Sequence, residues 1–346
     1  MKATKKYLLN IIIQPMAAII TALALGAAMV WLSGKSPINA YKALFFGAFG
    51  SKANFSEVLI KTVPLILCGL CVAICFRSSF FNIGAEGQFY MGALAATWVG
   101  VSVNVSALLM LVLLMGTAFL AGGLWCVIAG WLKVKLGCSE VINTIMLNYI
   151  AMGLAGFAVN GPLRENAGFL PQSDLIAKDG WLPVILSGTR LHAGLIIALV
   201  CTVLVGFLLF KTVFGYQIRA VGLSPKAADY AGINSSRRLL QTCLLSGGLA
   251  GLAGAVELMG ITHRLYEIFS PGYGFDAIAV SLLANNNPLG ILASAFLFGI
   301  LRAGSSHMQM SAGVSSVLIY MIQALVIIFI LLSTIRSKFG ETKGAG

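Results

Sequence analysis

The chain has 346 residues, of which 59% are hydrophobic and 10% are charged, and its mean hydropathy is +0.93. A soluble domain carries about 25% charged residues, so this composition excludes an ordinary water-soluble protein. The net charge of +12 does not indicate nucleic-acid binding, because most basic residues lie in short segments between apolar runs, as the positive-inside rule describes.

Long apolar runs predict an all-α polytopic membrane protein, since about 20 apolar residues cross a bilayer. The uncharged run from Tyr7 to Gly34 is longer than a signal-peptide core of about 7–15 residues, so we expect a retained first span. We expect about ten membrane-spanning helices, some of them broken, in one transmembrane domain over residues 1–346. Their predicted ranges are 12–33, 60–76, 84–101, 106–132, 140–160, 191–213, 239–257, 275–285, 288–303 and 314–335.

The charge distribution orients these spans. Lys2, Lys5 and Lys6 precede the first span, and Arg336 and Lys338 follow the last. Basic residues favour the cytoplasmic side, so we expect both termini in the cytoplasm, which requires an even number of crossings. The two long outer segments, 34–58 and 161–190, form either a rim that meets a partner or ordinary connecting loops.

The most informative motif is Phe-Phe-Asn-Ile-Gly-Ala-Glu-Gly-Gln at residues 80–88, between two long apolar runs. Ionisable groups at membrane depth are expensive, so they usually serve a solute path or a tight structural pairing. Carboxamides both donate and accept hydrogen bonds, so they suit a neutral, hydroxyl-rich or heterocyclic solute. For each Asn or Gln, hydrogen bonding between helices is the alternative. The candidate path residues are Asn82, Glu86, Gln88, Asn143, Asn148 and Asn286.

Cysteine and histidine do not suggest a metal site in the sequence. Cys68, Cys71 and Cys75 share one helix face, and all seven cysteines fall within or at the ends of predicted spans. We interpret them as a small, polarisable packing surface. We interpret the three histidines, His192, His263 and His307, as isolated polar residues at outer helix ends.

Residues 214–238 form a cytosolic segment unlike the other loops. Ser224 is a suitable N-cap and Pro225 suits the first helical position, so a short helix is expected from Lys226 to Ala231. Gly232 suits the left-handed residue that ends such a helix. We expect a surface knob between two spans, and the alternative is a helical loop without a partner.

The eighth span is short. The run from Asp276 to Ala284 amounts to about 15 Å of helix, and Asn285-Asn286-Asn287-Pro288 ends it. Non-helical backbone at membrane depth is tolerated only inside protein or against water. The alternative is an eight-span protein in which residues 275–303 form a re-entrant hairpin.

Signatures of catalysis are absent from the sequence. It contains no G-x-x-x-x-G-K-[ST], no H-E-x-x-H and no G-x-S-x-G, so neither a nucleotide-binding loop nor these hydrolase motifs are encoded. We therefore expect a polar-lined conduit and not an enzyme, with any energy supplied by another chain. A passive channel or facilitator is the rival interpretation.

Four segments in this order resemble the permease subunits of bacterial ABC importers in the ribose/branched-chain amino-acid permease superfamily. They are residues 81–88, 140–149, 219–233 and 286–304. Within that superfamily, the glutamate-containing motif and the chain length look most like the larger permease of nucleoside importers.

The resemblance implies an importer in the bacterial plasma (inner) membrane, embedded in lipid. Its partners would be a second, paralogous permease, one or more ABC ATPase subunits and an extracytoplasmic substrate-binding lipoprotein, with no nucleic acid. ATP and Mg would reside on the ATPase, leaving no cofactor in this chain. Nucleosides are the expected substrate, and a simple-sugar (ribose-type) permease is the alternative.

The resemblance also implies that the knob is the coupling helix that docks into the ATPase. Lys226-Ala227-Ala228, with Gly232 four positions after Ala228, is similar to the E-A-A-x-x-x-G pattern of importers, although Lys226 replaces the acid. The residues assigned to coupling are Arg219, Gly222, Ser224, Pro225, Ala227, Ala228 and Gly232.

Overall fold

The computed structural model describes residues 20–329, apart from 22, 166–169, 316–317, 319, 323 and 326–327. The start of the expected first span, parts of the expected last span and both termini lie outside the described residues. The chain forms two compact units, one of residues up to 58 together with those from 297 onward, and one of residues 59–296.

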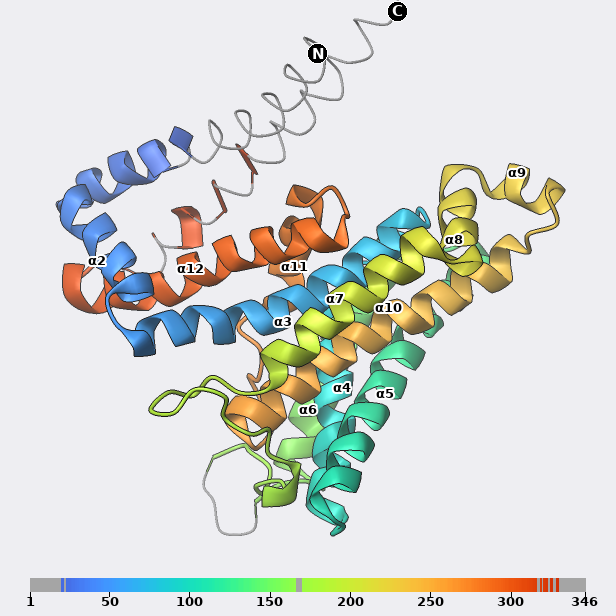
Figure 1. The fold of residues 1–346 in the computed structure, drawn as a ribbon, viewed down its shortest axis with the longest axis horizontal. Helices are drawn as coiled ribbons and strands as arrows, with labels where there is room; N and C mark the ends of the chain where they lie inside the picture. Colours follow the sequence, from blue (N-terminus) through green and yellow to red (C-terminus); the bar gives the residue numbers. More distant parts are fainter. Residues whose placement is uncertain are drawn as a thin grey trace, which may run out of the picture. The chain divides into compact units, whose positions relative to one another are not determined.

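The named elements of the described residues are all helices (Figure 1). They are α2 (Pro37–Phe49), α3 (Lys52–Arg77), α4 (Ala85–Ser102), α5 (Ala107–Leu136), α6 (Glu140–Asn160), η1 (Lys178–Gly180), α7 (Gly194–Lys211), α8 (Val213–Leu223), α9 (Pro225–Tyr230), α10 (Ser235–Glu257), η2 (Leu258–Thr262), α11 (Tyr273–Leu283) and α12 (Pro288–Ala312).

Six of the described helices are long and apolar enough to cross a bilayer. They are α3, α5, α6, α7, the continuous helix Ser235–Thr262 formed by α10 and η2, and α12. Leu23–Leu32 and α11 are shorter apolar helices. The all-helical, multi-pass class is therefore confirmed for the described part of the chain, whereas the expected number of about ten crossings is not.

Two helices extend well beyond the apolar runs that marked them in the sequence. α3 begins at Lys52, where the expected span began at 60, and α12 continues to Ala312, where the expected span ended at 303. Apolarity marks the stretch suited to lipid, but backbone hydrogen bonding continues a helix through polar residues. The segments 52–59 and 304–312 are such polar extensions.

A tight turn separates α11 from α12. Asn285 and Asn286 both adopt left-handed backbone conformations, with φ of 50° and 54°. Asparagine tolerates this region better than most residues, because its short polar side chain can form local hydrogen bonds. The Ser281 hydroxyl donates to Asn286 Oδ1 at 2.9 Å, so the asparagine run ends α11 as the sequence indicated.

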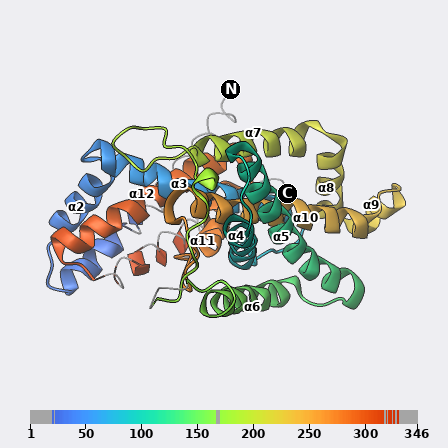
Figure 2. The ribbon, with the colours of Figure 1, turned by 90° about the horizontal axis from the view of Figure 1, so that it is seen from below.

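Glycines let α10 approach α5 and α4 closely within the unit of residues 59–296. A Cβ added at Gly247 or Gly251 would overlap the backbone of Gly122 or Ala118 on α5. On the α4 side, Gly251 leaves no room for a Cβ at Gly92. Figure 2 views α4 nearly end-on, with α5, α6 and α11 around it. The G-x-x-x-G face of α10 thus serves packing inside the chain.

The other unit is held together by contacts between α2 and the C-terminal half of α12. Val30, Ala40 and Met308 belong to its buried cluster, and a Cβ at Gly47 would overlap the side chain of His307. The Tyr41 hydroxyl donates to the carbonyl of Leu23 at 2.6 Å, which links α2 to the short apolar helix before it.

The segment 170–193, most of which was expected on the outer side, packs along the chain that follows α10 and η2. Backbone N–H groups of Ser173, Ile176 and Leu182 donate to the carbonyls of Leu265, His263 and Met259, each at 2.9 Å. This segment is therefore anchored to the protein along its length and is not a free loop.

Candidate functional site

Asn82 and Gln88 form a reciprocal pair of carboxamides in the interior. Asn82 Nδ2 donates to Gln88 Oε1 at 3.1 Å, and Gln88 Nε2 donates to Asn82 Oδ1 at 3.0 Å. The N–H of Gly84 also donates to Asn82 Oδ1, at 2.9 Å. Both side chains are at most 1% exposed. Because buried polar groups must be paired, these two reciprocal hydrogen bonds fix the chain before α4 against the first turn of that helix.

The carboxamide pair extends to α3 and α10 through Cys71 and Ser246. The Cys71 thiol donates to Gln88 Oε1 at 3.3 Å, and the Ser246 hydroxyl donates to the carbonyl of Cys71 at 2.8 Å. Asn82 Nδ2 also lies 3.4 Å from Ser246 Oγ. Three elements of the helix bundle therefore share one hydrogen-bonded network around residues 82–88.

Asn148 holds the same motif from α6. Its Oδ1 accepts from the N–H of Gly87 at 2.7 Å, and its Nδ2 donates to the carbonyl of Ile83 at 2.9 Å. Thr144, one turn earlier, accepts from the N–H of Ile83 at 3.2 Å. A Cβ at Gly87 would lie 2.8 Å from Asn148 Cα. Glycine at position 87 is thus required for α6 to reach the start of α4.

Glu86 joins the start of α4 to the start of α11. Its Oε2 accepts from the N–H of Gly274 at 2.6 Å, and the side chain is buried. A Cβ at Gly274 would overlap the backbone of Glu86. A carboxylate that accepts from a backbone N–H at a helix start is a favourable use of a buried charge.

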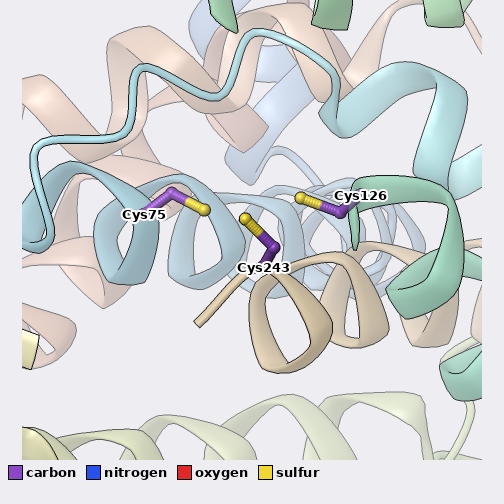
Figure 3. Close-up of side chains that lie close together, drawn as sticks. All are labelled: Cys75, Cys126 and Cys243. Atoms are coloured by element: carbon purple, nitrogen blue, oxygen red, sulfur yellow. The ribbon is translucent and has the colours of Figure 1, made fainter. Parts of the chain in front are cut away.

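Three cysteines from three helices meet beside this network (Figure 3). The Sγ atoms of Cys75, Cys126 and Cys243 all lie within 4.8 Å of one another, and Asn82 Nδ2 lies 3.6 Å from Cys126 Sγ. Thiols so arranged could ligate a thiophilic ion such as Zn²⁺ or Cu⁺, which the sequence did not suggest because only the fold brings these three thiols together. The same sulfurs share a buried cluster with Phe80, Ala129 and Leu239, so they also pack as apolar groups.

A turn at residues 77–79 connects the motif to the knob. The Ser79 hydroxyl donates to the carbonyl of Gly222 at 2.6 Å, and a Cβ at Gly222 would overlap the carbonyl oxygen of Arg77. Arg77 donates in turn to the carbonyls of Asn285 and Asn286, each at 3.2 Å. The knob, the end of α3 and the turn before α12 are therefore in direct contact.

The knob has the local structure that its sequence predicts. The Ser224 side chain caps α9 by accepting from the N–H of Ala227 at 3.3 Å. The N–H of Ile233 donates to the carbonyl of Ala228 at 2.9 Å, and Gly232 has a left-handed backbone conformation with φ of 80°. Leu223 is 89% exposed and Tyr230 is 94% exposed, so both large side chains lie on the surface of the knob and not in the helix bundle.

The remaining candidate residues lie apart from the motif network. Asn143 is half-buried, and its Nδ2 has no acceptor among the described residues. Asn286 is bound to Ser281. Arg219 lies over the ring of Phe210, with its guanidinium carbon 5.5 Å from the centroid. The structure therefore groups Asn82, Glu86, Gln88 and Asn148, and it places Asn143, Asn286 and Arg219 elsewhere.

His192 and His263 lie close together, where α7 begins and η2 ends, which the sequence did not indicate. Trp181 stacks on His263 with ring centroids 3.8 Å apart, and His192 is buried against Gly194 and Gly260. Burial, followed by the proximity of His263, lowers the pKa of His192 to about 4. Burial also lowers the pKa of His263. Their interpretation as isolated residues is therefore wrong, since sequence separation hides their proximity.

Taken together, apolar helices, a buried polar network and an exposed knob bonded to the turn before that network fit a multi-pass membrane permease. The chain belongs to the family described as branched-chain amino acid transport system / permease component, whose model matches residues 54–331. Members of this family are membrane subunits, and so this chain is a permease subunit and not an enzyme.

Three relatives match nearly the whole chain. The guanosine ABC transporter permease protein NupP of Bacillus subtilis (strain 168) is 38% identical, covering 98% of each chain. The glucose ABC transporter permease protein TsgB13 of Haloferax volcanii is 34% identical, covering 94% of this chain and 88% of its own. The nucleoside ABC transporter permease protein NupB of Lactococcus lactis subsp. cremoris is also 34% identical, covering 92% of this chain and 90% of its own.

Each of these three organisms also holds a second, less similar permease. The guanosine ABC transporter permease protein NupQ of Bacillus subtilis is 28% identical over 257 residues. The nucleoside ABC transporter permease protein NupC of Lactococcus lactis is 28% identical over 262 residues. The putative glucose ABC transporter permease protein TsgC13 of Haloferax volcanii is 29% identical over 252 residues, so paired permeases of unequal similarity occur in all three organisms.

Proposed function

We propose that this chain is the transmembrane permease subunit of an ATP-driven ABC importer that moves nucleosides across the bacterial plasma membrane. Two of its nearly full-length relatives carry a nucleoside or guanosine permease name. The carboxamides around residue 82 suit purine and pyrimidine edges and ribose hydroxyls, because they both donate and accept hydrogen bonds.

The observation that carries the coupling mechanism is the contact between Ser79 and Gly222. ATP binding and hydrolysis on a partner would move the knob, and the knob would pull on the turn at residues 77–79. That turn continues into the Asn82 network and contacts the turn before α12. In a transition of this kind, packed helices move as rigid bodies between two discrete arrangements.

We propose an assembly that matches the names of the relatives. It holds a second, paralogous permease, ABC ATPase subunits that carry ATP and Mg, and a substrate-binding lipoprotein outside the cell, all associated with membrane lipid and none with nucleic acid. The paired permeases of Bacillus subtilis and Lactococcus lactis support the second permease.

We propose about ten crossings with both termini in the cytoplasm. The six long apolar helices, the two shorter ones and α4 account for most of them, and residues 314–335 would supply the last. The knob then lies on the cytoplasmic side, as basic residues near it favour.

Within the proposed path, the candidate residues have different roles. Asn82, Glu86, Gln88 and Asn148 already hold partners inside the protein, so they would shape the path and change partners as it opens. The amide donor of Asn143 has no acceptor among the described residues, so Asn143 is the better candidate for direct solute contact. Asn286 would act through the turn that Arg77 contacts.

A simple sugar is the second candidate substrate, because the Haloferax volcanii relative is named a glucose permease and matches over 94% of this chain. A passive facilitator is the rival mechanism. Both are separated from the proposal by one experiment on proteoliposomes that hold the complete complex.

That experiment measures uptake of labelled adenosine with an active ATPase and with an ATPase-dead partner, and with excess uridine, ribose or glucose as competitor. ATP-dependent uptake that uridine blocks and sugars do not would support a nucleoside importer. Competition by ribose or glucose would assign the sugar class. Uptake that is indifferent to the ATPase would contradict an importer and favour a facilitator.

A further inference from the structure

A polar cavity of about 340 Å³ lies at the base of the knob, between α8 and the first turns of α10. Its charged and amide lining comes from Gln217 on α8 and from Arg237, Arg238 and Gln241 on α10. The knob that it adjoins projects from the rest of the unit of residues 59–296 (Figure 1).

Arg238 is held rigidly by neutral partners. Its guanidinium donates to Gln241 Oε1 at 2.9 Å and to Gln217 Oε1, and its guanidinium carbon lies 4.5 Å from the ring centroid of Phe214. Its Nε is buried without an acceptor among the described residues. The side chain is thus fixed in place. No carboxylate among the described residues that line the cavity neutralises its charge, and its Nε–H has no acceptor there.

The nearest acid on the knob is already committed. Asp229 accepts from the N–H and the hydroxyl of Ser235, both at 2.9 Å, and so caps the start of α10. The described residues that line the cavity include two arginines and no Asp or Glu. The positive end of the α10 dipole adds to the same field, and together these groups favour an anion.

We propose that this cavity receives a carboxylate side chain of the ATPase subunit, an inference that rests on the proposed importer function. A rigid guanidinium suits the planar geometry of a carboxylate, with which it forms two parallel bonds. A protein partner fits better than a free anion because Leu223 and Tyr230, two large side chains of the same knob, are strongly exposed. Lys226 on α9 extends the basic surface, so the matching ATPase face is acidic.

The test measures binding of the purified ATPase to the permease pair in nanodiscs at low and raised salt. We expect Arg238→Gln and Arg237→Gln each to weaken binding about tenfold at low salt, and less at raised salt, because screening removes part of the interaction in the native protein. Arg238→Lys keeps the positive charge but loses the planar guanidinium that forms two parallel hydrogen bonds. We therefore expect binding weaker than that of the native protein and stronger than that of Arg238→Gln. Arg164→Gln, an exposed arginine in the outer segment, is the matched control and should bind as the native protein does.

A second charge variant and a cross-linking experiment test the same contact independently of Arg238→Gln. Arg237 is exposed, so its variant tests the charge even if the Arg238 variant does not fold. Arg238→Cys should form a disulfide cross-link under oxidising conditions with one of the ATPase carboxylate positions, each changed to cysteine in turn. Native-like binding by both charge-removing variants overturns this inference alone, whereas failure of the native pair to bind the ATPase overturns the importer proposal as well.

Free anions and lipid supply the remaining outcomes. Stabilisation of the isolated permease pair by inorganic phosphate, lost in Arg238→Gln while ATPase binding is unchanged, would assign the cavity to a free anion. The same result with phosphatidylglycerol nanodiscs in place of phosphate would assign it to a lipid headgroup. Either result overturns the proposal.

Discussion

The Ser79 hydroxyl donates to the carbonyl of Gly222 across 2.6 Å, and this bond fastens the knob to the turn that leads into the Asn82 motif. Ser79 itself has a left-handed φ of 54°, and the preceding residue, Ser78, is buried. The turn is thus held in an uncommon conformation by tertiary contacts. Any motion of the knob reaches the motif through only a few residues, so changes there should separate folding from coupling.

Gly222→Ala should uncouple ATP hydrolysis from uptake. A Cβ at this position would overlap the backbone oxygen of Arg77, so the knob must shift away from the turn while the helices on either side keep their packing. We expect protein in the membrane at native levels, ATPase activity retained and uptake reduced at least tenfold. Gly116→Ala is the control, since a Cβ there meets nothing within 4 Å. Native uptake by Gly222→Ala would refute the assigned role of this contact.

Gly232→Ala tests the knob's own shape. Its φ of 80° disfavours any side chain, yet a Cβ there meets nothing within 4 Å, so the effect is conformational, about 1–2 kcal/mol. We expect weaker ATPase binding and lower uptake. Gly188→Ala has a nearly equal φ of 77° and equal free space in the outer segment, so it should leave coupled uptake intact. Equal losses in both variants would mean that strain alone, not the knob, is responsible.

Asn82 and Gln88 should behave as one unit. Asn82→Ala leaves the buried Gln88 carboxamide without its reciprocal partner, and an unpaired buried group costs about 1–3 kcal/mol. We expect each single alanine variant to lower the melting temperature in detergent, and the double variant to lose clearly less than the sum of the two. Additive losses would contradict the pairing, and lost uptake at native stability would indicate direct solute contact instead.

Glu86→Gln and Glu86→Ala separate a structural bond from a need for charge. In the native protein, the N–H of Gly274 donates to Glu86 Oε2 at 2.6 Å. Glutamine keeps an oxygen that can accept this hydrogen bond, whereas alanine removes the acceptor. We expect Glu86→Gln to retain most uptake and stability, and Glu86→Ala to lose both. Full uptake and expression of the alanine variant would remove Glu86 from the proposed path, and equal defects in both variants would show that the charge itself is required.

The outer histidine pair should make stability depend on pH. The pKa of His192 is lowered to about 4 in the folded protein, against about 6.5 in an unfolded chain. Between these values the unfolded chain binds a proton that the folded protein does not, so the free energy of unfolding falls as pH drops from about 6.5 towards 4, by at most about 3 kcal/mol. The lowered pKa of His263 acts in the same direction.

Melting temperatures in detergent between pH 7.5 and 4.5 check this expectation. His192→Asn removes the titrating group but keeps a side-chain oxygen that can accept from the N–H of Gly194, as His192 Nδ1 does at 3.1 Å. Its melting temperature should fall less over the same pH range. An equal fall in native protein and variant would assign the acid sensitivity to other groups.

Local chemistry made part of this protein predictable from sequence. Ser224, Pro225 and Gly232 specify the knob because capping, proline and left-handed glycine act within a few residues. The asparagine run ends α11 for the same kind of reason. Apolar run length likewise indicated most of the long helices, although it missed the polar ends of α3 and α12, since lipid contact and backbone hydrogen bonding stop at different residues.

The partners within the site came only from the tertiary structure. The motif at residues 80–88 was identifiable because a charge between apolar runs is expensive, but its bonds to Asn148, Ser246 and Gly274 depend on how α6, α10 and α11 are rotated and how closely glycines let them approach. The same holds for the three cysteines, for the histidine pair and for Ser79 with Gly222. Sequence determined which apolar stretches form long helices, and packing between distant helices decided which polar groups meet, because that register depends on side-chain shape across the whole bundle.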